Sequence, residues 1–228
     1  MRMHAVRAAI LLIAPLMLAE TEVSKSATLT PSSVVKALRA GNLRYVRGAM
    51  VHPHATSADR RRLATGQNPR AVIVGCSDSR VPPEIIFDQG LGDLFTIRVA
   101  GNIANHEVLG SVEYALEHLH TPVIVVLGHE KCGAVSAALH PEGIEGRIRE
   151  LLDAIHPAVD RARTLHHPES ALLHDAVEAN VDLQLHHLTN DDPVVHEGVI
   201  HKKVLVIGAI YDLETGRVRF LDSNPLSH

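Results

Sequence analysis

Two cysteines and one of the seventeen histidines stand where metal chemistry is possible. Cys76 ends the apolar run AVIVGC, whereas His129 and Cys132 follow the apolar run PVIVVL. If the two runs are neighbouring parallel strands, their carboxyl ends meet at one edge of the sheet, where ligand sites of open α/β sheets form. Two thiolates and one imidazole suit zinc, and three protein ligands leave a fourth tetrahedral position open, as in catalytic sites.

The same residues have plainer interpretations. A cysteine at a strand end is commonly a small buried apolar side chain, and in an exported chain the pair could form a disulfide. With seventeen histidines in the chain, one H-x-x-C spacing is weak evidence by itself. Asp78 and Arg80, close behind Cys76, favour the metal site, because such charges are costly to bury unless they pair or face a charged centre.

Short apolar runs predict the strands that would position these residues. The runs over 71–76, 94–99 and 122–127 are typical of strands buried on both faces. A further strand is expected over 203–210, with a hairpin partner over 218–221 after the turn Glu214-Thr215-Gly216.

Helical patterns separate these strands. Thr30 and Pro31 are typical of a helix start, and an apolar stripe extends that helix to residue 47, although Gly41 is expected to weaken it. Four more helices are expected over 57–65, 108–119, 144–155 and 169–188, and a short one is expected from Asp192-Pro193. Gly66 is the expected stop of the helix over 57–65. Alternating strands and helices predict a single α/β domain with a mainly parallel central sheet flanked by helices, an N-terminal helical arm and a C-terminal antiparallel hairpin edge.

Composition excludes several classes of partner. The formal charge of −4 gives no general attraction for nucleic acid or anionic lipid. Three Phe, three Tyr and no Trp leave few rings for stacking on bases, so no nucleic-acid partner is expected.

The first residues are typical of a secretory signal. Arg2 and Arg7 precede an apolar run over 8–19, which is too short for the roughly 20 residues that span a bilayer. Ser24 and Ser26 favour cleavage before Ala27. We therefore expect a signal peptide over 1–26, an α/β domain over 27–228, a periplasmic or secreted location and no stable membrane anchor.

The motif CSDSRVPPE over 76–84, with Gly128-His129 and Cys132-Gly133 downstream, resembles that of the β-class carbonic anhydrases. The resemblance covers about 66–138 and resumes over 208–216, and the helix over 30–47 is similar to the family's N-terminal arm. It implies reversible hydration of carbon dioxide to bicarbonate and a proton by zinc-bound hydroxide, the reaction of a carbonate dehydratase. One Zn²⁺ per chain would be held by Cys76, His129 and Cys132.

The resemblance also implies roles for neighbouring residues. Arg80 would hold Asp78 away from the metal so that Asp78 accepts a hydrogen bond from the bound water, although in some members this Asp becomes a fourth ligand and closes the site. Four further residues match substrate-binding positions: Gln67, Phe95, Tyr114 and Gly133. Because the family forms dimers or dimer-based tetramers, a homodimer or homotetramer is expected.

Two other functions fit the same residues. One is a carbonyl sulfide or carbon disulfide hydrolase on the same scaffold, which would differ in pocket shape. The other is a non-catalytic binding protein with Cys76 and Cys132 joined in a disulfide, against which Asp78, Arg80 and Gln67 argue. The inhibitory bicarbonate site that some bacterial members build around a Trp is not expected, because this chain has Ile73 there and no Trp.

Overall fold

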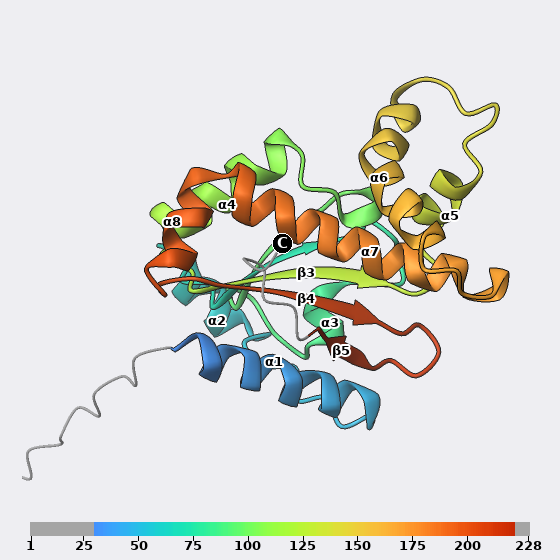
Figure 1. Ribbon diagram of the computed structural model, residues 1–228. Helices are drawn as coiled ribbons and strands as arrows, with labels where there is room; N and C mark the ends of the chain where they lie inside the picture. Colours follow the sequence, from blue (N-terminus) through green and yellow to red (C-terminus); the bar gives the residue numbers. More distant parts are fainter. Residues whose placement is uncertain (1–29, 222–228) are drawn as a thin grey trace, which may run out of the picture.

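The computed structural model describes residues 30–221, so the expected signal peptide over 1–26 and its cleavage before Ala27 lie outside the described residues. The described chain forms a five-stranded sheet in the order β2-β1-β3-β4-β5 (Figure 1). The strands are β1 (Ala71–Gly75), β2 (Leu94–Arg98), β3 (Val123–His129), β4 (Leu205–Tyr211) and β5 (Val218–Phe220). The first four are mutually parallel and β5 is antiparallel to β4, which confirms the predicted fold class and hairpin edge.

Helices cover both faces of this sheet (Figure 1). On one side lie α1 (Pro31–Val46) and α3 (Pro83–Ile86), and α2 (Ser57–Leu63) follows α1 along the chain. On the other side lie α4 (His106–Glu117), α7 (Leu172–His186) and α8 (Pro193–Ile200). Beside α7 pack α5 (Gly133–Leu139) and α6 (Arg147–Arg163). Among residues 30–221, no helix combines the length and the apolar character that crossing a bilayer requires.

The strands differ in burial. Every residue of β1 and β3 is buried, as their unbroken apolar runs predict. The expectation that the run over 94–99 is buried on both faces is wrong, because β2 is only partly buried and ends on an exposed Arg98. The reason is topological: β2 is an edge strand that pairs with β1 alone in the described chain, and an apolar run does not show which strand forms an edge.

Several predicted helix boundaries need correction. Helix α2 ends at Leu63 with Ala64 as its cap, so Gly66 is not its stop. Helix α6 begins only at Arg147, and Ile148 is exposed although it fits the apolar stripe. Helices α3 and α5 were not expected, because four and seven residues are too few to show a helical period.

Gly41 has a packing role in α1. A Cβ at this position would lie 1.8 Å from the carbonyl oxygen of Phe87, so only glycine allows α1 to approach that backbone. The next residue, Asn42, is buried and donates to the carbonyl oxygens of Ile86 and Gly216, and its side-chain oxygen accepts from the N–H of Val218. The glycine therefore allows the close docking of α1 on the Phe87 backbone.

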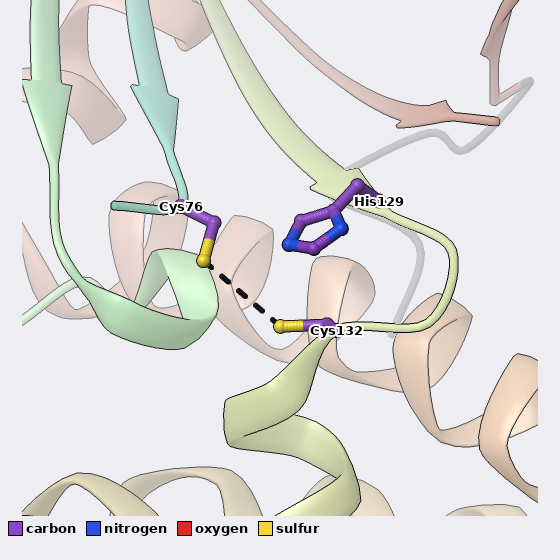
Figure 2. Close-up of side chains that lie close together, drawn as sticks. All are labelled: Cys76, His129 and Cys132. Atoms are coloured by element: carbon purple, nitrogen blue, oxygen red, sulfur yellow. Dashed lines mark hydrogen bonds between the residues drawn. The ribbon is translucent and has the colours of Figure 1, made fainter. Parts of the chain in front are cut away.

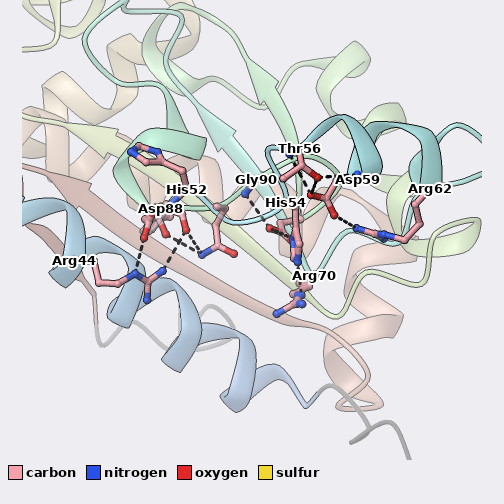
Figure 3. A network of polar contacts seen from close by, with 12 residues as sticks. Arg44, His52, His54, Thr56, Asp59, Arg62, Arg70, Asp88 and Gly90 are labelled. Carbon is pink, nitrogen blue, oxygen red and sulfur yellow. Dashed lines mark hydrogen bonds and ion pairs between the residues drawn. The ribbon is translucent and has the colours of Figure 1, made fainter. Parts of the chain in front are cut away.

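Two buried carboxylates hold the segment that joins α1 to α2 (Figure 3). Asp88 accepts hydrogen bonds from Nε of Arg44 at 2.5 Å and from the N–H groups of Val51 and His52, each at 3.0 Å. Asp93 is bonded to Nδ1 of His54 at 2.8 Å and accepts from the N–H of Gly90 at 2.9 Å. These hydrogen bonds tie the two carboxylates to the backbone and side chains around them and so fix the connecting segment.

Candidate metal centre

The sheet brings the three predicted ligands together. Strands β1 and β3 are paired in parallel with Gly75 beside Leu127, so Cys76 and His129 both lie at the carboxyl ends of these strands. Cys132 follows as the N-terminal cap of α5 and points back toward them (Figure 2). The ligand atoms of the three residues all lie within 4.8 Å of one another. The prediction that these side chains converge is confirmed.

One nitrogen of His129 is presented to this centre. Its Nδ1 lies 2.9 Å from the carbonyl oxygen of Glu130, and since a carbonyl can only accept, Nδ1 carries the hydrogen. The other nitrogen, Nε2, then has a lone pair, and this buried atom has no hydrogen-bond partner among the described residues. A histidine oriented through one nitrogen by a backbone carbonyl, with the other free, is the usual arrangement of a metal ligand.

The two sulfurs lie within hydrogen-bond distance of each other. They lie 4.0 Å apart, about twice the ~2.05 Å of a disulfide bond, and both cysteines are free in the described chain. The hydrogen bond that the Cys132 thiol donates lowers the pKa of Cys76, against the opposing effect of burial. Its role as donor to Cys76, together with burial, raises the pKa of Cys132.

These donors fit a zinc ion. Cys76, His129 and Cys132 are 4 %, 1 % and 1 % exposed, and the bare Nε2 of His129 is buried among them without a hydrogen-bond partner in the described chain. A divalent cation would satisfy that nitrogen and would bind both sulfurs as thiolates, releasing the thiol protons. The two-sulfur, one-nitrogen set is borderline-soft and matches zinc, which confirms the cofactor expected from the sequence.

Asp78 and Arg80 form a fork beside the centre. Nε of Arg80 donates to Oδ1 of Asp78 at 2.9 Å, and Nη2 donates to Oδ2 at 2.7 Å. The Arg80 side chain and its N–H hold the pKa of the Asp78 carboxyl well below its usual range, although burial opposes them, so it is ionised. The structure shows the arrangement in which Arg80 holds Asp78, and Asp78 is not part of the ligand group.

Two residues that support this site were missed in the sequence. Arg98, at the end of β2, donates from Nε to the carbonyl oxygen of Cys76 at 2.9 Å and from Nη2 to that of Asp78 at 2.6 Å. Gly101 donates its N–H to the sulfur of Cys76 at 3.4 Å. The position of Arg98 at the end of an apolar run is a sequence signal that could have indicated its role, whereas nothing local in the sequence marks Gly101.

The four expected substrate residues occupy different places. Gly133 follows Cys132 directly, and a Cβ there would meet nothing within 4 Å, so the backbone beside the ligand is open to approach. Gln67 lines a surface hollow with Leu63 and Leu91, at the amino-terminal end of the strands. Phe95 is paired with Val72 near that same end, and its ring lies 6.2 Å from that of Tyr114.

Three of these residues therefore lie away from the metal centre of their own chain. Gln67 precedes β1 and Cys76 follows it, and five strand residues span about 16 Å at ~3.3 Å each. Within one chain, the structure brings only Gly133 to the three ligands and leaves Gln67, Phe95 and Tyr114 at the opposite end of the sheet.

Comparison with known proteins agrees with this site. A family model described as carbonic anhydrase matches residues 71–218. Carbonic anhydrase 2 of Mycobacterium tuberculosis is 39 % identical over 201 residues, which cover 84 % of this chain and 93 % of the relative. Among solved structures, the β-carbonic anhydrase CafA of Aspergillus fumigatus aligns with a TM-score of 0.67 and 31 % identity, over 83 % of this chain and 91 % of that one.

A second solved structure extends the comparison. A tetrameric β-carbonic anhydrase of Sordaria macrospora aligns with a TM-score of 0.65 and 27 % identity, over 84 % of this chain and 98 % of that one. The family match, the identities and the converging ligands agree, and the chain belongs to the β-class carbonic anhydrases.

Proposed function

We propose that this chain catalyses the reversible hydration of carbon dioxide to bicarbonate and a proton as a zinc lyase. The main support for this proposal is the convergence of Cys76, His129 and Cys132 at the carboxyl ends of β1 and β3, with the free Nε2 of His129 among them. The carbonic anhydrases that the chain resembles support the choice of substrate.

Different residues of this chain have different roles in the proposed reaction. Zinc, when bound by the three ligands, supplies the Lewis acidity that makes water a nucleophile near neutral pH. Asp78 is ionised and 3.9 Å from Nε2 of His129, so it is placed to accept a hydrogen bond from the attacking water and to orient it. Arg80 neutralises that carboxylate and holds it on the rim, and the bare Gly133 leaves room for the substrate.

The test is zinc per chain together with the rate of carbon dioxide hydration, measured by stopped flow across pH. We expect one zinc per chain and a rate that rises with pH as a single ionisation, and removal of zinc by a chelator should abolish the rate until zinc is returned. A protein that holds stoichiometric zinc and does not hydrate carbon dioxide would contradict the proposed function.

We also propose that the chain acts as a homodimer or a dimer-based tetramer, in which one subunit supplies Gln67, Phe95 and Tyr114 to the metal centre of another. Tyr114 is 48 % exposed and its ring lies beside Phe95 of the open edge strand β2, so an apolar pair is available to a second copy. These residues cannot reach their own centre along the strands, and the Sordaria macrospora relative is tetrameric.

Mixed subunits distinguish this arrangement from action within one chain. A Cys132→Ser chain lacks a ligand but keeps Gln67, and a Gln67→Ala chain lacks Gln67 but keeps its ligands. If Gln67 acts across subunits, refolding the two inactive chains together restores up to about one quarter of the parental sites, as random pairing of a two-fold dimer requires. Activity that stays at the level of the separate chains would show that Gln67 does not act across the interface.

Export is a further proposal, and the basic start with its apolar run over 8–19 supports it. Expression in a Gram-negative host followed by osmotic release should give a chain that begins at Ala27, as intact mass would show. A full-length chain retained in the cytoplasmic fraction would contradict the proposed periplasmic or secreted location.

A further inference from the structure

The turn that follows β2 has an unusual backbone. Gly101 and Asn102 both have positive φ, of 71° and 47°, in the 3₁₀ turn Ala100–Asn102. A Cβ on Gly101 would lie 2.5 Å from Cδ1 of Ile155, so any other residue here would strain the backbone and displace the end of that side chain. This turn directs the N–H of Gly101 to the sulfur of Cys76, at 3.4 Å.

Two buried amides of α7 hold that turn from the opposite side. Nδ2 of Asn180 donates to the carbonyl oxygen of Gly101 at 2.8 Å. Oε1 of Gln184 accepts from the N–H of Ala104 at 2.8 Å, and its Nε2 donates to Oδ1 of Asn180 at 3.0 Å. Asn180 and Gln184 are each 1 % exposed and one helical turn apart, so they form a linked pair that bonds to the middle of the turn and to the backbone just after it.

Polar side chains at buried helix positions need a reason. Burying an amide costs free energy that its hydrogen bonds only offset, and apolar residues at 180 and 184 would pack against the core without that cost. The backbone hydrogen bonds of the pair go not to the three ligands but to the turn that contacts Cys76 and to Ala104 just after it.

We propose that Asn180 and Gln184 are positioning residues for the metal centre, which act by fixing the Gly101 N–H on the Cys76 sulfur. The inference rests on the proposed function in one respect, namely that Cys76 is a zinc ligand. A hydrogen bond to a ligand thiolate orients it and spreads its charge, and the removal of such outer contacts typically weakens metal binding by about 10- to 100-fold. Asn180 therefore influences how tightly zinc is held although it is not one of the three ligands.

The test measures metal binding and not turnover. In Asn180→Ala, zinc affinity, determined by competition with a chromogenic chelator, should fall by about tenfold or more. In the cobalt-loaded protein, the sulfur-to-cobalt charge-transfer band should move to longer wavelength, because a thiolate without its hydrogen bond gives up charge more readily. Gln184→Met, which removes the other amide of the pair with little change in volume, should give a smaller change in the same direction. This variant provides the test if Asn180→Ala does not fold.

Asn42→Ala is the matched control, because Asn42 is also a buried amide with three backbone hydrogen bonds, which go to Ile86, Gly216 and Val218 and not to the turn beside Cys76. It should lower stability and leave both zinc affinity and the cobalt spectrum unchanged. Parental affinity and spectrum in Asn180→Ala, or equal losses in Asn42→Ala, would overturn the inference. A parental protein that binds no zinc would instead overturn the proposed function.

Discussion

Oδ2 of Asp78 lies 3.9 Å from Nε2 of His129, the buried nitrogen that lacks a partner in the described chain, while Arg80 holds the same oxygen at 2.7 Å. The carboxylate is thus close enough to act on water at the centre and is restrained from approaching further. A group so placed works through its charge and its acceptor oxygens, and replacing it with an amide changes both while keeping its shape.

Asp78→Asn should therefore retain one zinc per chain and lose hydration rate. We expect a fall of about 100-fold, the usual order for a positioned proton acceptor. Because the pKa of Asp78 lies well below its usual range, the loss should be the same across neutral and alkaline pH. Stopped-flow hydration and metal analysis on the same samples provide the measurement.

Asp59→Asn is the control for this variant. Asp59 also pairs with an arginine, accepting from Nη2 of Arg62 at 3.0 Å, but it belongs to the exposed start of α2. Its variant should hydrate carbon dioxide at the parental rate. If Asp78→Asn also kept the parental rate, Asp78 would have no part in the mechanism.

Cys132→Ser should lose zinc. A hydroxyl is a harder and far less acidic ligand than a thiol, and at this buried position it leaves Cys76 and His129 as the only ligands of the set. Metal analysis after dialysis should give well below one zinc per chain. Ser136→Ala, about one turn further along α5, is the control and should keep its zinc, and stoichiometric zinc in Cys132→Ser would rule out Cys132 as a ligand.

The sequence predicts the centre well because its three ligands are tied to strand ends. Apolar runs locate β1 and β3, and the parallel arrangement then fixes that Cys76 and His129 share an edge. The supporting pair on α7 could not be predicted in this way. In the sequence, Asn180 and Gln184 are polar residues that interrupt a helical pattern, and their backbone partners lie about 80 residues away, in and just after a turn with positive φ.

The sequence also does not show which strand forms the open edge of the sheet. The run over 94–99 has the composition of a central strand, and only the strand order shows that β2 forms the edge in the described chain. The register explains why Phe95 cannot contact the centre of its own chain, because it lies beside Val72 near the start of β1 and the centre lies beyond its end. Pattern predicts that a strand exists, whereas its neighbours depend on long-range packing.

Asp88 predicts an acid-dependent loss of stability. Burial alone raises the pKa of this carboxyl, but hydrogen bonds from the Val51 N–H, Arg44 and the His52 N–H lower it below its usual range overall. The stabilisation is therefore complete above the unfolded pKa of about 3.9 and is lost as pH falls through the lower folded value. Asp88→Asn should lower the free energy of unfolding by about 1–3 kcal/mol at neutral pH.

Urea unfolding at neutral pH and below about pH 4 measures this effect, and the difference between variant and parent should shrink in acid. Asp153→Asn is the control, because the exposed pair of Asp153 with Arg149 is worth less than about 1 kcal/mol. A difference that stays constant with pH would mean that the charge of Asp88 does not contribute to stability.

Gly41→Ala and Gly110→Ala should change stability in opposite directions. Both glycines lie inside helices, and helix propensity alone predicts that each alanine stabilises by about 1 kcal/mol. At Gly110 a Cβ would meet nothing within 4 Å, so that gain is expected. At Gly41 it would lie 1.8 Å from the Phe87 carbonyl oxygen and must push α1 away, at a cost of about 3 kcal/mol.

Thermal unfolding of the two variants and the parent shows whether helix propensity or packing against Phe87 determines the stability of the Gly41 variant. The displaced α1 would also lose the three backbone hydrogen bonds of Asn42, so Gly41→Ala and Asn42→Ala should be less than additive when combined. A Gly41→Ala protein as stable as Gly110→Ala would show that α1 does not dock on the Phe87 backbone. Full additivity of the Gly41 and Asn42 variants would show that the two residues stabilise α1 independently.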